Sequence, residues 1–184
     1  MTPSLIAQCT GARLDRAERF AGPLSAGMAF YAIDTPKRQA AFLAQIGHES
    51  GGLKWTSELW GPTAVQSRYE GRKDLGNTQV GDGSKYRGHG LIQTTGRFNH
   101  ARVRDRLRKR FDDVPDFEDD PQALADTQWA SLSACDYWDD RKLNALADEG
   151  DFLRITLKIN GGTNGLDDRY ARHGAAMVAL RITT

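Results

Sequence analysis

The chain has 184 residues, of which 25 are basic and 24 acidic, so its formal net charge at pH 7 is +1. This balance gives no overall attraction to nucleic acids or other polyanions, and the length suits a single domain with a real hydrophobic core. Its two cysteines, Cys9 and Cys135, are too few for a disulfide scaffold or a four-cysteine metal site, and we expect two free thiols. We expect neither a metal ion nor a cofactor.

The N-terminus has no early basic residues and only a three-residue apolar run, which is not the layout of a secretory signal. Nothing in the chain approaches the length of a membrane span. We therefore expect a protein that is made in a cytoplasm, without stable membrane insertion. If its target lies outside the cytoplasm, the protein would reach that target only through the action of another protein.

Residues 1–33 predict short N-terminal packing helices, broken near Gly22-Pro23. A clearer helix follows. Asp34 or Thr35 can cap its first N–H groups, Pro36 suits the first helical position, and Gly51-Gly52 can end it. Glu49 falls two turns after Phe42, at the edge of the predicted buried face, where lost hydration and the helix C-terminus both favour a protonated carboxyl.

Residues 54–86 form a long segment with few apolar residues and many glycines, which is typical of a functional loop. The segment carries two further carboxylates, Glu58 and Glu70. The run from Tyr86 to Asn99 then places glycines around Leu91-Ile92, together with Gln93, Thr95 and Asn99. Its glycine spacing does not fit a phosphate-binding loop.

An arginine-rich helix is predicted from Phe98 to Phe111, directly before an acidic run that ends at Asp120. The acidic run nearly cancels the arginines, so a solvated face with internal ion pairs is favoured over a nucleic-acid site. Further helices are predicted from Asp120, over about 150–159 and over about 166–180, the last with Leu166, Tyr170, Met177 and Leu180 inward. The fold class is mainly α, with an irregular loop or small β wing between 55 and 92.

Cleavage of a glycosidic bond needs one protonated carboxyl to assist the leaving oxygen and one ionised carboxylate to act on water or on the sugar. Glu49 fits the first role. Glu58 and Glu70 both lie in a polar loop that would keep a carboxylate ionised, so both remain candidates for the second.

Three separated motifs carry a resemblance to a known family. They are His48-Glu49-Ser50-Gly51-Gly52, the run Tyr86-Arg87-Gly88-His89-Gly90-Leu91-Ile92-Gln93-Thr94-Thr95-Gly96, and Ile159-Asn160-Gly161-Gly162 followed by Asp168-Arg169. From about Pro36 to Leu180 the chain resembles the family 19 glycoside hydrolases of the bacteriophage endolysin type, which are related to plant chitinases. The resemblance implies a lysozyme-like helical domain with a substrate cleft.

The resemblance also implies roles for individual residues. Glu49 matches the general acid, Glu58 the second carboxylate of the phage members, and Thr95 the hydroxyl residue that holds the attacking water. Glu70 lies close to where the chitinase spacing puts the base and stays an alternative. The residues implied in sugar binding or in organising the carboxylates are Gln93, Asn99, Asn160 and Arg169, with Tyr86 as an added stacking or hydrogen-bonding surface.

The chain departs from the family pattern at three positions, where His89, Thr94 and His100 replace an expected arginine, an isoleucine or leucine, and a tyrosine. His89 would place a titratable group near the site. For His48 a role in supporting the cleft and a purely structural role are both open.

The implied function is an endolysin that hydrolyses the β-1,4 bonds of peptidoglycan, in the manner of a muramidase or lysozyme, and lyses the host cell. A chitinase and a lytic transglycosylase are the alternatives, and a nucleic-acid-binding module would rest on the arginine-rich helix alone. We expect residues 1–184 to form a single catalytic domain, with 34–184 as the family core, no separate wall-binding module, and a monomeric state.

Overall fold

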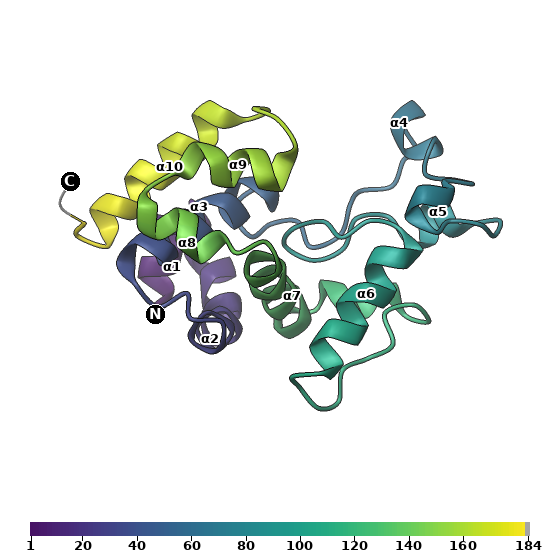
Figure 1. Ribbon diagram of the computed structural model, residues 1–184, viewed down its shortest axis with the longest axis horizontal. Helices are drawn as coiled ribbons and strands as arrows, with labels where there is room; N and C mark the ends of the chain where they lie inside the picture. Colours follow the sequence, from purple (N-terminus) through teal and green to yellow (C-terminus); the bar gives the residue numbers. More distant parts are fainter. Residues whose placement is uncertain (183–184) are drawn as a thin grey trace.

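The computed structural model describes residues 1–182 and is mainly helical, as predicted. A helical body at one side of Figure 1 contains both termini and is separated from a smaller lobe by one long helix. The helices of the body are α1 (Pro3–Thr10), α2 (Leu14–Phe30), α3 (Pro36–Glu49), α8 (Leu143–Glu149), α9 (Phe152–Asn160) and α10 (Leu166–Ala179). The separating helix is α7 (Thr127–Asp140).

The smaller lobe, here called the wing, spans residues 54–125. Its elements are α4 (Ala64–Ser67), η1 (Lys73–Leu75), α5 (Asp82–Lys85), α6 (Arg97–Arg108) and η2 (Pro121–Ala125). Isolated bridges join Ser57 to His89 and His89 to Thr94, and no longer ladder forms within residues 1–182. Of the two predicted alternatives, an irregular loop or a small β wing, the structure shows loops and helices, with both isolated bridges made at His89.

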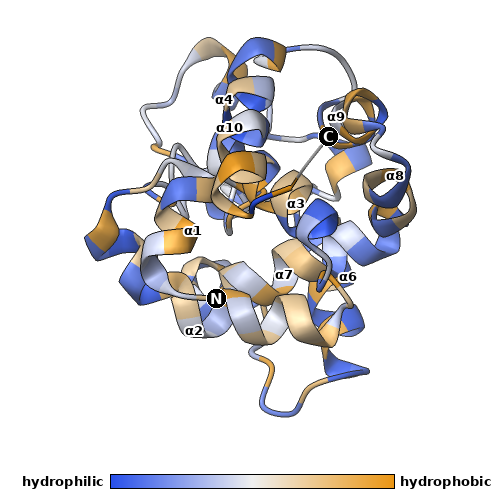
Figure 2. Cartoon of the chain, turned by 90° about the vertical axis from the view of Figure 1, so that its left-hand side faces the viewer, coloured by the Kyte–Doolittle hydropathy of each residue, from blue (hydrophilic) through white to orange (hydrophobic). Residues whose placement is uncertain are grey.

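The core of the body is centred on α3, in which every residue from Ala40 to Gly47 is buried. This helix packs against α1 and α10, and Figure 2 shows hydrophobic residues along the helices that meet there. Contact with α1 is close because Gly47 lies against the backbone of Thr10, and a Cβ on Gly47 would come within 2.5 Å of the Thr10 carbonyl oxygen. Within residues 1–182 no helix is long and apolar enough to cross a membrane.

The N-terminal segment differs from its prediction. The break falls at Gly11, where the backbone is left-handed, and α2 runs straight through Pro23. A proline inside a helix loses one backbone hydrogen bond and crowds the preceding turn. Here Phe20 and Leu24 on either side of it are buried against the core, and this packing offsets the loss.

Two other helices were misread or missed. α8 was not predicted, and α10 buries Arg169 and Ala176 while Tyr170 is 45% exposed. The apolar pattern placed Tyr170 inward and did not include Arg169 in the inner face, since arginine is rarely buried unless it is paired. The reason for its burial is the ion pair described below.

The arginine-rich helix is α6, which ends at Arg108, three residues before its predicted end. Its arginines are paired, as predicted, but only partly with the adjacent acidic run. Arg104 bonds Asp116 at 2.7 Å, whereas Arg106 bonds Asp136 on α7 at 2.6 Å. Ion pairs with α7 thus join the wing to the body, in addition to the apolar contacts of Leu107 and Phe117 with the shared core.

His89 and His100 form a buried pair at the centre of the wing. His100 Nδ1 lies 2.9 Å from the Gly96 carbonyl oxygen, so it carries the proton, and His100 Nε2 therefore accepts from His89 Nδ1 at 3.0 Å. Burial lowers the pKa of His89 to about 3 and that of His100 to about 4. His89 is thus a structural residue of the wing, and two of the three departures from the family pattern touch each other.

Replacing Gly47 by alanine tests the close contact between α1 and α3. We expect Gly47→Ala to lower the free energy of unfolding by roughly 1–3 kcal/mol, because the added methyl meets rigid backbone. Gly174→Ala on α10 is the matched control, since nothing lies within 4 Å of its added Cβ. We expect the control to be neutral or slightly stabilising in urea unfolding. Equal effects of the two variants would contradict the contact.

The histidine pair predicts a pH-dependent stability. A folded-state pKa below the ordinary value of 6.5 means that the unfolded chain binds more protons, so stability is complete above pH 6.5 and falls as the pH drops toward 4. We expect a loss of roughly 2–4 kcal/mol between pH 7 and pH 5, measured by urea unfolding.

His100→Gln should flatten this slope, whatever its effect on absolute stability. His173 on α10 also has a pKa lowered by burial, so His173→Phe controls for its share. A slope unchanged in His100→Gln would show that the pair is not responsible.

Candidate active site

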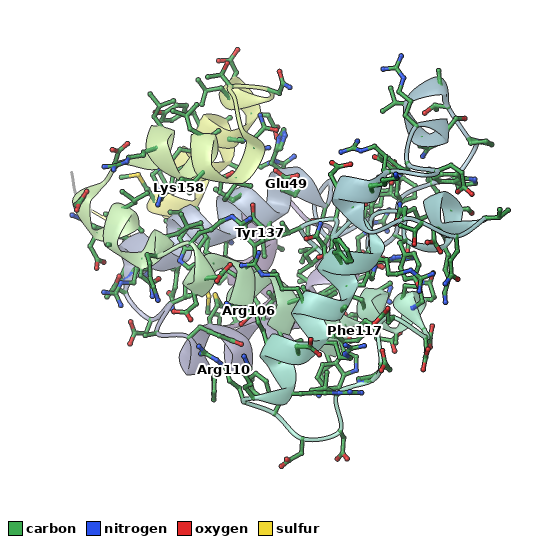
Figure 3. All side chains as sticks on the ribbon, turned by 45° about the vertical axis from the view of Figure 1, so that its right-hand side comes forward. Glu49, Arg106, Arg110, Phe117, Tyr137 and Lys158 are labelled. Atoms are coloured by element: carbon green, nitrogen blue, oxygen red, sulfur yellow. The ribbon has the colours of Figure 1, made fainter. Side chains whose placement is uncertain are left out.

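The ends of α3 fix the place of Glu49. Thr35 caps the helix by accepting from the backbone N–H of Arg38 at 3.3 Å, and Pro36 takes the first position, as predicted. At the other end the N–H of Gly52 donates to the carbonyl of Gly47 at 2.7 Å, and Gly52 has a φ of 70°. The chain turns away directly after Glu49, which leaves its side chain on the surface between the body and the wing (Figure 3).

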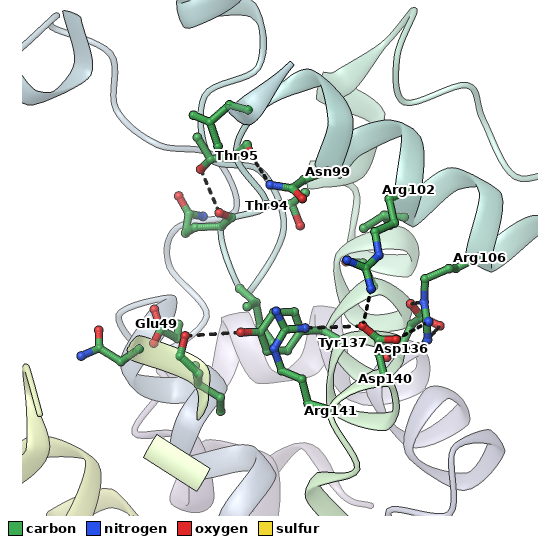
Figure 4. A pocket seen from close by; sticks show the side chains of 17 residues that line it. Glu49, Thr94, Thr95, Asn99, Arg102, Arg106, Asp136, Tyr137, Asp140 and Arg141 are labelled. Carbon is green, nitrogen blue, oxygen red and sulfur yellow. Dashed lines mark hydrogen bonds and ion pairs between the residues drawn. The ribbon is translucent and has the colours of Figure 1, made fainter. Parts of the chain in front are cut away.

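Glu49 lines a cavity of about 370 Å³ between the two lobes (Figure 4). One wall comes from the end of the hairpin, which is formed by residues 89–94, and from α6. The other comes from α7, α9 and the end of α3. The lining residues are Glu49, Leu75, Ile92, Gln93, Thr94, Thr95, Asn99, Arg102, Val103, Arg106, Ser133, Asp136, Tyr137, Asp140, Arg141, Ile159 and Asn160. The structure therefore brings Glu49, Thr95, Gln93, Asn99 and Asn160 together, as the sequence predicted.

A buried guanidinium holds the Glu49 carboxylate. Arg169 on α10 donates to a Glu49 oxygen at 2.5 Å and also bonds the side-chain oxygen of Gln45, one turn earlier on α3. Gln45 in turn donates to Thr156 on α9 at 2.8 Å. Arg169 thus positions Glu49 and is too buried to present a sugar-binding surface.

His48 supports the site from behind. Its Nδ1 lies 2.7 Å from a carboxylate oxygen of Asp168, and its ring packs against Gly165 at the start of α10. Arg172 bonds the same carboxylate at 2.7 Å. The hydrogen bond from Arg172, with a smaller contribution from His48, holds the pKa of Asp168 below its usual range. His48 therefore fastens the end of α3 to α10 and does not line the cavity, which agrees with the structural role.

Hydrogen bonds from side chains to backbone carbonyls shape the wall opposite Glu49. Gln93 has a φ of 53°, rare for a residue with a side chain, and its amide donates to the Gly90 carbonyl at 2.8 Å. The Thr95 hydroxyl donates to the Gln93 carbonyl at 3.0 Å, and the Asn99 amide donates to the Thr95 carbonyl at 2.7 Å. These bonds hold the Thr95 hydroxyl at the cavity, across from Glu49 in Figure 4.

The two candidates for the second carboxylate have different surroundings. Glu58 accepts from the Gly88 N–H and from the Gln66 amide, each at 3.0 Å. Gly88 itself lies against the side chain of Gln93, which lines the cavity. Glu58 therefore does not line the cavity itself. It bonds Gly88, which in turn contacts the cavity-lining residue Gln93.

Glu70 is engaged elsewhere. Its two oxygens accept from the backbone N–H groups of Gly81 and Gly83 at 2.6 and 2.7 Å, which fixes the turn that begins α5. Neither Glu58 nor Glu70 lines the cavity that contains Glu49. The surroundings favour Glu58, and its role as the second carboxylate stays a prediction.

Asn160 and Tyr137 complete the side of the cavity near Glu49. The side-chain nitrogen of Asn160 is buried and has no hydrogen-bond partner within residues 1–182, which leaves a donor for a substrate oxygen. The Tyr137 hydroxyl donates to the Ile159 carbonyl at 3.3 Å. Burial raises the pKa of Tyr137 despite the opposing charge of Arg141, so the hydroxyl remains a donor.

Tyr86 contradicts its prediction. It is fully buried, donates its hydroxyl to the Glu118 carbonyl at 2.7 Å, and is covered by the Arg97 guanidinium at 4.7 Å from its ring. It offers no surface to a substrate. Its role is to pack the wing beneath the hairpin.

Sequence reasoning missed the charged part of the cavity, formed by Arg102, Arg106, Asp136, Asp140 and Arg141. The arginines were read as part of a solvated face and the aspartates were not used. The available signal was the i, i+4 spacing of Asp136 and Asp140, which puts both on one face of α7. Across the described part of the chain, no group of three or more histidine, cysteine or acidic side chains is arranged to hold a metal ion.

The family of the chain is shown by a related protein and not by a family model. No model of a known protein family matches it. A glycosyl hydrolase family 19 domain-containing protein of Haemophilus influenzae is 35% identical over 169 aligned residues, covering 77% of this chain and 79% of that protein.

A solved structure, chitinase C from Streptomyces griseus, matches all of this chain and 77% of its own, with a TM-score of 0.76 and 21% identity. At that identity the match shows the shared fold. The helical body and the wing thus form a fold shared with a chitinase, and the 35% identical relative shows that the chain is a glycoside hydrolase that belongs to glycosyl hydrolase family 19.

Proposed function

We propose that the protein is an endolysin that hydrolyses β-1,4 glycosidic bonds of bacterial peptidoglycan. The observation that carries the proposal is the position of Glu49, held by a buried arginine at the edge of an open cavity whose other wall presents Thr95. Glu49 protonates the leaving oxygen, and Glu58 assists a water molecule near Thr95. In this proposal the protein acts as a monomer and reaches the wall after release by another protein.

Chitin is the main alternative substrate, because one solved structure that shares this fold is a chitinase. The charged side chains along the cavity favour a charged glycan over neutral chitin. The reaction products distinguish a peptidoglycan hydrolase from a chitinase. The protein is incubated with purified peptidoglycan and with chitin oligomers, and the fragments are identified by mass spectrometry.

Each activity leaves its own chain end. A muramidase leaves reducing N-acetylmuramic acid, a glucosaminidase leaves reducing N-acetylglucosamine, and a lytic transglycosylase leaves anhydro sugars. Reducing muramic ends support the proposal. Cleavage of chitin oligomers with none of peptidoglycan would replace it with the chitinase.

The acid role predicts that Glu49→Gln lowers peptidoglycan hydrolysis by roughly 10²–10⁴-fold. The glutamine keeps an oxygen that can accept from Arg169, so the variant should remain folded by circular dichroism. Substantial residual activity in a folded variant would remove Glu49 from the acid role.

Glu58→Gln and Glu70→Gln form a matched pair for the second carboxylate. We expect Glu58→Gln to reduce activity at least tenfold per folded molecule. Glu70→Gln sets an amide NH₂ against a backbone N–H, so it should lower stability by about 1–3 kcal/mol and leave the activity of folded molecules near that of the wild type. The opposite pattern would assign the role to Glu70, and two dispensable carboxylates would favour a transglycosylase.

A further inference from the structure

The end of the cavity farthest from Glu49 is lined by cations. Arg102 and Arg106 on α6 and Arg141 directly after α7 converge on one carboxylate, Asp140, at 3.0, 2.5 and 3.7 Å. Figure 4 shows these side chains along the wall that continues from Glu49 past Tyr137. A substrate chain lying in the cavity would therefore pass both the acid and this cluster.

The cluster carries more positive than negative charge. Besides Asp140 the only other cavity-lining carboxylate there is Asp136, within the described residues. Asp136 is already held by Arg106 at 2.6 Å and by the Tyr31 hydroxyl at 3.2 Å. Three guanidinium groups thus share two carboxylates, and one positive charge is left uncompensated on this wall.

Arg102 and Arg141 are the arginines with unused donors. The Arg102 side chain is 62% exposed and makes a single bond, to Asp140. Arg141 stacks on the Tyr137 ring with its guanidinium 3.5 Å from the ring centre, and its contact with Asp140 at 3.7 Å is too long for a hydrogen bond. A guanidinium has five N–H donors in a planar fork that matches a carboxylate.

We propose that Arg102 and Arg141 bind a carboxylate carried by the muramic acid unit of the substrate. This carboxylate lies either on the lactyl group itself or on the peptide stem attached to it. The inference rests on the proposed function, because chitin carries no carboxylate. It assigns the preference for peptidoglycan to one place in the cavity, separate from the residues that cleave the bond.

The expected contribution is moderate. Charge-assisted bonds from arginine to a carboxylate are among the stronger hydrogen bonds, but both arginines are partly exposed and Asp140 competes for them. We therefore expect each arginine to change the affinity for a muramyl ligand by roughly three- to tenfold. Added salt should weaken the same step, since exposed charges are screened.

Binding is measured by calorimetry in a Glu49→Gln background, so that no ligand is cleaved. The ligands are a tetrasaccharide of alternating N-acetylglucosamine and N-acetylmuramic acid with peptide stems, the same tetrasaccharide with free lactyl carboxylates, and the neutral tetramer of N-acetylglucosamine. Arg102→Gln and Arg141→Gln should weaken muramyl binding three- to tenfold and affect the neutral tetramer less. The muramyl ligand that responds identifies the source of the carboxylate.

Two controls make the result specific. Arg19→Gln removes the same charge from an exposed position on α2 and should change nothing, whereas Arg102→Lys keeps the charge and should recover part of the affinity. Equal losses for all three ligands, no loss for any, or no muramyl binding by the parent would overturn the inference. A wild-type protein that releases no sugar from peptidoglycan refutes the proposed function instead.

Discussion

The ion pair between Arg169 and Glu49 is the constraint on which the site depends. An arginine in the interior requires a compensating charge, since removal from water is expensive for an unpaired ion. Arg169 meets that requirement with Glu49 and uses its other donors on Gln45 and on the Asn164 carbonyl. The start of α10, the last turns of α3 and, through Thr156, α9 are therefore locked around one carboxylate. A buried pair of this kind contributes little net stability, and its value here is the fixed orientation of the acid.

The second lobe is attached both by ion pairs and by apolar contact, since Leu91, Leu107 and Phe117 of the wing belong to the same hydrophobic cluster as the helices of the body. α7 is buried on the side that packs on α2 and presents Asp136 and Asp140 to the arginines of α6. The wing itself has a small core, with Tyr86, Leu91 and the histidine pair beneath the hairpin. The result is a cavity wall with rigid backbone at Thr95 and charged, partly exposed side chains farther along.

Sequence reasoning predicted the parts of the molecule that depend on local pattern. The caps and glycines around α3 fixed both its ends, and the carboxylate at its C-terminus followed from helical spacing. Sequence reasoning failed where tertiary contacts override local preference. Pro23 lies inside a helix because its neighbours are buried. Arg169 is buried because it pairs with Glu49, and Tyr86 is covered by elements that are distant in the sequence. The charged end of the cavity was missed because its residues come from two helices that are about 30 residues apart in the sequence, α6 and α7.

The histidine pair has a consequence for how this chain can change. His89 donates a hydrogen bond to His100, and both isolated bridges of the wing, to Ser57 and to Thr94, are made by the backbone of His89. A single replacement at either position leaves a buried polar group facing an unsuited neighbour, whereas a joint replacement can restore a matched pair. The two positions are therefore coupled, and the effects of replacing them on stability should not add.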